Sequence, residues 1–92
     1  MKMNSAQIEH TIDHLECKVV PEDDPVTPQL KRIFGDHTYF LDQSGLNIVE
    51  PGEADHKDVR FGVVVNIADW ADTGSQSLAR HDPERTGLVV FF

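Results

Sequence analysis

The chain has 92 residues and a formal net charge of −8, with 8 lysine and arginine residues against 16 aspartate and glutamate residues. This length suits one domain over residues 1–92 and excludes a second. A protein that binds the phosphates of a nucleic acid needs a stripe of basic residues, which this sequence lacks. Binding to anionic membranes is disfavoured for the same reason. The acidity favours solubility and allows a basic protein partner, although an acidic surface in water needs none.

Cysteine content and hydropathy indicate the compartment. Cys17 is the only cysteine, so no intramolecular disulfide is expected. Residues 1–10 carry no apolar run typical of a secretory signal, and no segment approaches the roughly 20 apolar residues of a membrane helix. We therefore expect a soluble protein of the reducing cytoplasm.

Residues 5–20 are compatible with two local structures. Apolar residues recur at helical spacing, with Asn4 or Ser5 as the cap: Ile8, Ile12, Leu15 and Val19. The end of the segment also alternates as a strand does, and its β-branched residues favour a strand. We predict a helix that gives way to a strand near Leu15.

A second short helix is predicted to begin at Asp24 or Thr27. Pro28 is tolerated in a first helical turn, and Gly35 suits the left-handed position that ends a helix. The apolar side of this helix consists of Leu30, Ile33 and Phe34.

Residues 37–50 are typical of a β-hairpin that turns at residues 43–45. A three-residue loop would place Asp42 opposite Leu46 and would make Phe40 face Ile48. Side chains alternate across a strand, so Tyr39 then faces Val49 on the other surface. Each face of the hairpin is apolar, and we expect each to be covered.

The rest of the chain predicts two more strands. Residues 59–67 alternate, with Val59, Phe61, Val63, Val65 and Ile67 on one face and Arg60, Gly62, Val64 and Asn66 on the other. Residues 51–58 are predicted to be a polar loop, and residues 72–87 a long loop with one helical turn at 76–80. Residues 87–92 are apolar on both faces and predict a strand paired into the sheet.

These elements predict an α+β domain: an antiparallel β-meander of 3–5 strands with one or two short helices packed on one face. Helices on one face would leave the other uncovered, and a homodimer or a partner protein would then cover it. The candidate contact residues are Tyr39, Phe40, Val64, Trp70, Val90, Phe91 and Phe92. Trp70 has two interpretations, a binding anchor or a cap on the domain's own core.

His10, His14 and Cys17 are candidate metal ligands. If the first segment is helical throughout, their spacing places an imidazole pair and a thiolate on one stripe, a ligand set that suits zinc or copper. His37, His56 or His81 would supply a fourth ligand. The site fails if Leu15 to Val20 is a strand, and surface histidines are the competing interpretation.

Other polar groupings lack catalytic signatures. The acidic residues around His56 and His81 are typical of solvated loops, and neither a Gly-x-Ser-x-Gly elbow nor a glycine-rich phosphate loop occurs. We therefore expect that the protein is not an enzyme and binds no cofactor. The favoured function is a small acidic interaction or regulatory module that self-associates through a sheet face. The alternative is metal or small-ligand binding, and acidic mimicry of nucleic acid is a weaker third hypothesis.

Overall fold

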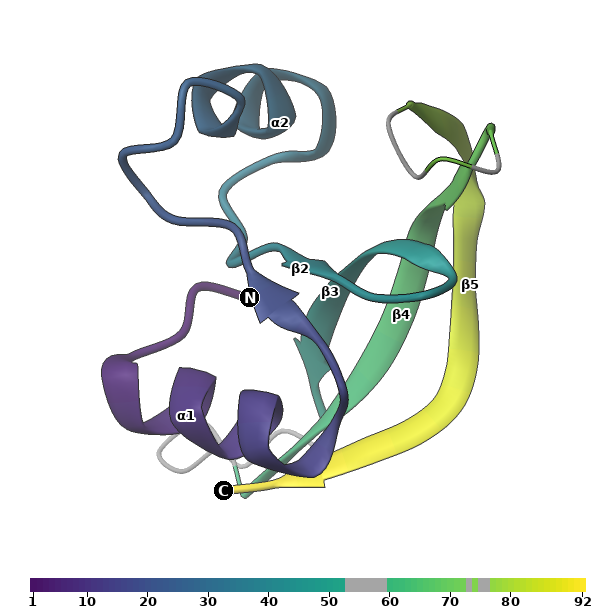
Figure 1. Cartoon of the computed structure of the whole chain (residues 1–92). Coiled ribbons are helices and arrows are strands. Elements are labelled where there is room, and N and C mark those ends of the chain that lie inside the picture. Colours follow the sequence, from purple (N-terminus) through teal and green to yellow (C-terminus); the bar gives the residue numbers. More distant parts are fainter. Residues whose placement is uncertain (53–59, 73, 75–76) are drawn as a thin grey trace.

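The computed structural model describes residues 1–52, 60–72, 74 and 77–92. Its two helices and five strands are, in chain order, α1 (Ser5–His14), β1 (Lys18–Val19), α2 (Thr27–Phe34), β2 (Phe40–Leu41), β3 (Gly45–Pro51), β4 (Phe61–Trp70) and β5 (Leu78–Phe91) (Figure 1). The sheet order is β1-β2-β3-β4-β5, with each neighbouring pair antiparallel. The predicted α+β meander with short helices is confirmed.

Both helices begin and end for local reasons. Asn4 and Gln7 form a capping box at the start of α1, in which each side chain accepts from the other residue's backbone N–H. Leu15 leaves α1 in an extended conformation, as predicted. Pro28 lies in the first turn of α2, and Gly35 ends that helix at a φ of 101°.

The hairpin forms, but the predicted register is wrong by one residue. Leu41 pairs with Leu46 and Phe40 pairs with Asn47, and the backbone N–H of Asp42 donates to the carbonyl of Gly45. The Asp42 carboxylate explains the tighter turn, because it accepts hydrogen bonds from the backbone N–H groups of Ser44 and Gly45.

The predicted loop over residues 72–87 is also wrong in part. Strand β5 begins at Leu78 and pairs with β4 as far as Phe91, so Leu78–Arg80 is extended where a helical turn was predicted. Most β5 side chains are exposed, and the strand lies at an edge of the described sheet with β4 as its one neighbour, so it pairs without an apolar alternation. Gln76 of that turn, residues 53–58 of the predicted polar loop, and Val59 lie outside the described residues.

Two apolar cores lie on opposite sides of the hairpin. The first core consists of Val20, Leu30, Tyr39, Leu46, Ile48, Val65, Ile67 and Ala68, and Phe34 of α2 packs against it. The second core consists of Met3, Phe40, Val49, Val64 and Val90, and Ile8 of α1 packs against it. Adjacent Tyr39 and Phe40 are 1% and 2% exposed, one in each core.

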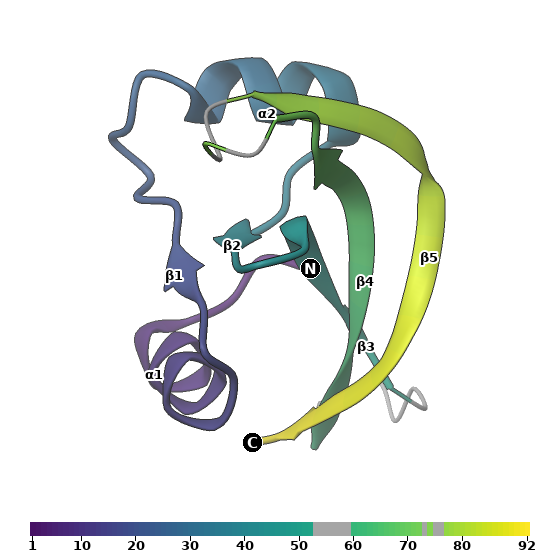
Figure 2. The same ribbon diagram turned by 45° about the vertical axis from the view of Figure 1, so that its right-hand side comes forward.

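The two helices therefore divide the cover between the two cores instead of sharing one face. Figure 2 shows β4 and β5 curving past both helices, with α2 near one end of these strands and α1 near the other. The premise that one face of the hairpin needs a partner for cover is wrong, because α1 and the N-terminal residues already cover it.

Candidate functional site

An apolar groove opens where α2 approaches the turn end of β4 and β5. Its walls come from six elements or their ends: Val20, Val26, Leu30, Leu41, Leu46, Trp70 and Leu78. The cavity volume is about 290 Å³. Val26 and Leu78 are exposed at its rim, whereas Leu30 and Leu46 are buried at its base. We refer to these seven residues as the groove.

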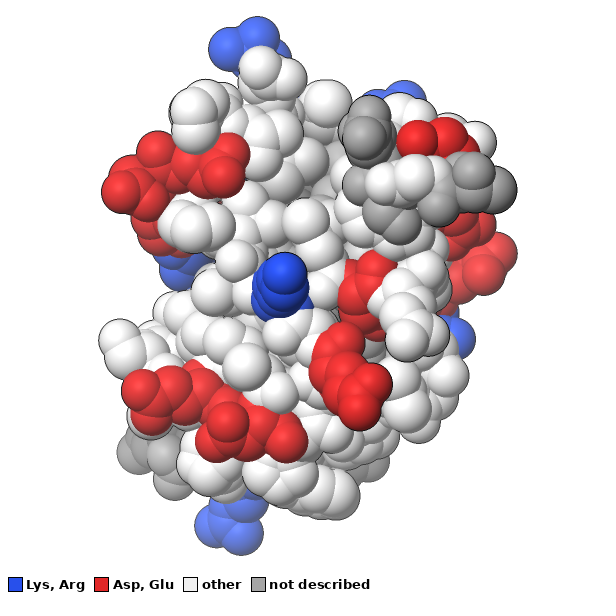
Figure 3. Space-filling view, viewed as in Figure 1, with Lys and Arg blue, Asp and Glu red and all other residues white. Residues whose placement is uncertain are grey.

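A second hollow adjoins the groove and shares Leu41 and Trp70 with it. The remaining lining residues of this adjoining hollow are Glu16, Cys17, Lys18, Asp42 and Gln43. Two carboxylates and one amine thus border the continuation of the apolar surface. On the face seen in Figure 3, acidic side chains gather in separate groups, with uncharged surface and a basic side chain near the centre between them.

Trp70 is held in place within the domain and also lines the groove. It pairs with Leu78 at the end of β4, and its indole Nε1 donates to the carbonyl of Asp42 at 2.8 Å. The ring is half-buried and lines both hollows. Trp70 can therefore cap the domain's own core and also serve as a binding anchor, because its ring packs within the fold and lines the groove.

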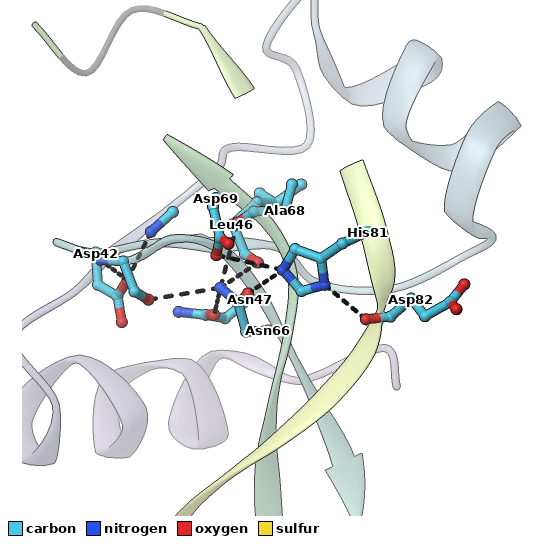
Figure 4. Close-up of polar contacts among 10 residues, drawn as sticks. Asp42, Leu46, Asn47, Asn66, Ala68, Asp69, His81 and Asp82 are labelled. Atoms are coloured by element: carbon cyan, nitrogen blue, oxygen red, sulfur yellow. Dashed lines mark hydrogen bonds and ion pairs between the residues drawn. The ribbon is translucent and has the colours of Figure 1, made fainter. Parts of the chain in front are cut away.

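A polar network lies beside this end of the sheet (Figure 4). Asn66 is only 6% exposed, and its Nδ2 donates to Asn47 Oδ1 at 2.9 Å and to the Ala68 carbonyl at 3.2 Å. Asn66 Oδ1 contacts Nε2 of His81, which is also 3.2 Å from Asp69 Oδ1. A lone polar residue between two apolar neighbours in a strand is the sequence signal by which Asn47 and Asn66 could have been found.

The His81 ring is surrounded by hydrogen-bond acceptors and acidic side chains. Its Nδ1 is 2.6 Å from the Asp82 carbonyl, and this contact, followed by the Asp69 carboxylate, raises the pKa of His81 above its ordinary value of 6.5. Desolvation opposes the increase. The histidine contacts found among the described residues involve no serine, threonine or cysteine side chain, so they provide no paired nucleophile and base.

The predicted contact residues separate into two groups. Tyr39, Phe40, Val64 and Val90 are buried in the two cores, so they present no surface to a partner in this structure. Their burial is explained by the cover from α1 and α2. The accessible group consists of Phe91, which is 68% exposed, half-buried Phe92, and Trp70 in the groove.

The structure does not bring His10, His14 and Cys17 together as ligands. The rings of His10 and His14 are 6.0 Å apart, and His14 Nδ1 lies 2.8 Å from the His10 carbonyl. Cys17 lies beyond the end of α1, packs against the second core and directs its Sγ at the Thr11 carbonyl. Burial raises the pKa of this thiol.

The proposed fourth ligands do not complete a site either. His37 contacts the Met1 amine, His81 belongs to the Asn66 network, and His56 lies outside the described residues. In the part of the chain that the structure describes, no group of three or more histidine, cysteine or acidic side chains is placed to hold a metal ion.

Two further findings concern membrane-spanning helices and similarity to known proteins. Neither helix in the described residues has the length and apolar character needed to cross a membrane. Comparisons with known protein families, curated proteins and solved structures found no match. The fold and the groove thus define a class only: a small α+β domain with an antiparallel meander and an apolar groove next to acidic residues.

Proposed function

We propose that this protein is a non-catalytic interaction module that binds a segment of a protein partner through the groove. The observation that carries the proposal is the open apolar hollow lined by Trp70 and Leu78 in a chain of net charge −8. Tryptophan is the side chain most often found to anchor protein interfaces, because it buries a large rigid surface at low entropic cost.

The shape of the groove favours side chains of a partner over a small molecule. Small-molecule sites usually enclose most of their ligand within about 300–1,000 Å³. The groove, at about 290 Å³, is slightly smaller than this range and has exposed rim residues such as Val26. One or two apolar side chains of a partner would fill it.

The charge next to the groove favours a basic partner. Glu16 and Asp42 border the adjoining hollow, and Lys18 is its one basic lining residue. Electrostatic complementarity mainly improves specificity and association rate, whereas the apolar anchor supplies affinity. A segment with alternating apolar and basic residues meets both requirements.

Homodimerisation remains a second candidate, because the end of β5 carries exposed apolar side chains. These are Leu88, Val89 and Phe91.

A cytoplasmic location also remains a proposal. The cysteine content supports it, since Cys17 is the only cysteine and small secreted domains usually depend on disulfides.

A fluorescence titration tests the main proposal, because Trp70 is the only tryptophan. A synthetic peptide of alternating leucine and lysine should shift Trp70 emission in a saturable manner, and a leucine–glutamate peptide should not. Leu78→Asp should weaken binding about tenfold or more by placing a charge in the groove. Phe91→Asp is the matched control, because it adds the same charge at an exposed site outside the groove.

Two outcomes would overturn the proposal. One is no saturable change in emission with the leucine–lysine peptide. The other is equally strong binding of the leucine–lysine peptide by Leu78→Asp and Phe91→Asp, which would indicate general charge attraction. Sedimentation velocity on the same samples reports the mass: a dimer that dissociates in Phe91→Asp supports homodimerisation, and a monomer at high concentration excludes it.

A further inference from the structure

The pairing of β4 with β5 is interrupted next to the groove. Asn66 pairs with Glu84 and Ala68 pairs with Arg80. Ile67 alone lies between these positions on β4, whereas residues 81–83 lie between them on β5. The extra residues form an irregularity in the ladder, and Pro83 has no backbone N–H to donate. Contacts between side chains must therefore hold β4 and β5 together at this point.

His81 provides such a contact between β5 and β4, and all of its partners are hydrogen-bond acceptors. Its Nδ1 faces the Asp82 carbonyl, and its Nε2 faces Asp69 Oδ1 and Asn66 Oδ1. The orientation of Asn66 is determined, because its Nδ2 already donates to Asn47 Oδ1 and to the Ala68 carbonyl. Both ring nitrogens must carry a proton to donate to these oxygens, so the contacts suit the imidazolium form.

The charged groups around the ring favour the same form. Asp69 faces it from β4, and the carboxylate of Glu84 lies nearby on β5 itself. From the β2–β3 turn, Asp42 holds the Ser44 hydroxyl, which is 3.5 Å from Asn66 Nδ2. A neutral His81 would lose one of its two donors and its attraction to Asp69.

The segment that depends on these contacts includes one wall of the groove. Beyond the irregularity, three pairs remain before the strands end: Ala68 with Arg80, Asp69 with Ala79, and Trp70 with Leu78. Trp70 and Leu78 both line the groove. A short ladder joined to the main sheet through an interruption opens more readily than a continuous one.

We propose that protonation of His81 fastens the outer end of the β4–β5 hairpin, so that the groove binds its partner more strongly as the pH falls through the near-neutral range. This regulation rests on the proposed function of the groove. The fastening itself does not, because it concerns contacts within this chain alone.

The first arm of the test measures the fastening without any partner. Ring nitrogen chemical shifts in ¹⁵N NMR should show that His81 keeps both ring protons to a pH above its ordinary pKa of 6.5, and Asp69→Asn should lower the pH at which this form disappears. Amide exchange of Leu78–Arg80, corrected for the intrinsic pH dependence, should quicken about tenfold as the pH rises from about 5.5 to about 8.5. His81→Gln should remove this dependence, whereas His10→Gln, at an exposed site on α1, should keep it.

The second arm repeats the leucine–lysine titration over the same pH range. Affinity should fall by roughly three- to tenfold toward high pH in the unmodified protein and in His10→Gln, and it should stay level in His81→Gln. If His81→Gln does not fold, Asp69→Asn serves in its place, with a transition at lower pH.

The outcomes separate the two proposals. A His81 ring that becomes neutral below pH 6.5, or exchange that does not depend on His81, overturns the fastening. Binding that is level with pH in the unmodified protein overturns the regulation while leaving the groove function intact. Confirmed fastening without any peptide binding overturns the proposed function and, with it, the regulation of binding.

Discussion

The indole Nε1 of Trp70 donates a 2.8 Å hydrogen bond to the backbone carbonyl of Asp42. This bond joins the last residue of β4 to the β2–β3 turn and so fixes one wall of the groove against another. The same turn is shaped by the Asp42 carboxylate, which accepts from Ser44 and Gly45. The position of the groove thus depends on contacts between residues far apart in the chain.

Replacing Trp70 with Phe should lower the free energy of unfolding by about 1 kcal/mol, because the Asp42 carbonyl loses its donor while most of the packing remains. Urea denaturation followed by circular dichroism measures this change, since the variant has no tryptophan fluorescence. A free energy equal to that of the unmodified protein would show that water replaces the indole donor fully.

Replacing Gly45 with Ala should cost at least about 2 kcal/mol of stability. Gly45 has a φ of 138°, and an added Cβ would lie 2.1 Å from the Ala68 carbonyl oxygen, so the β3–β4 pairing must shift. Gly87→Ala is the control, since its φ of 82° is also positive but a Cβ would meet nothing within 4 Å. That change should cost only about 1 kcal/mol, and equal costs would contradict the predicted clash.

Replacing Phe40 with Ala should destabilise the domain by about 3–5 kcal/mol, because the ring is 2% exposed at the centre of the second core. Phe91→Ala, at a residue 68% exposed, should cost less than about 0.5 kcal/mol. Chemical denaturation of both variants checks that α1 covers the second core in solution. A small cost for Phe40→Ala would instead indicate that this core is open.

The contribution of His81 to stability should decrease as the pH rises. Its pKa is raised in the folded protein, so the stabilisation is fully present below the unfolded value of 6.5 and is lost as the pH rises through the folded value. The melting temperature of the unmodified protein should therefore exceed that of His81→Gln most clearly in mild acid. A difference that grows toward alkaline pH would contradict this sign.

His37 should contribute with the opposite sign. Burial lowers its pKa, so its contribution is present above 6.5 and is lost as the pH falls through the folded value. Melting of His37→Gln, compared with His10→Gln, should show a difference that depends on pH in the reverse direction from that of His81→Gln. The same pH trend in both variants would refute one of the two assignments.

Zinc or copper added to metal-free protein should leave the melting temperature unchanged to within about 1 °C, because His10, His14 and Cys17 do not converge in the described structure. Native mass spectrometry checks the bound mass directly. A rise in melting temperature that Cys17→Ser abolishes would show that these residues rearrange to bind metal.

Local pattern was sufficient to predict most of the elements. Spacing of apolar residues located α1 and α2, Pro28 and Gly35 marked the bounds of α2, and alternation located β4. These features depend on residues within one or two helical turns or on neighbours along one strand, so a single sequence contains them. The hairpin also showed correctly that both of its faces must be buried.

Tertiary structure decided what covers each face, and here the sequence interpretation was insufficient. α1 packs against Phe40 and α2 against Tyr39, so no second chain is needed to bury either residue. The polar first part of β5, residues 78–86, and the His81 contacts with Asn66 and Asp69 also lie beyond local pattern. An edge strand needs only one neighbouring strand and no apolar alternation. The groove is assembled from six elements that are far apart along the chain, so its formation depends on long-range packing, whose free energy no short window of sequence contains.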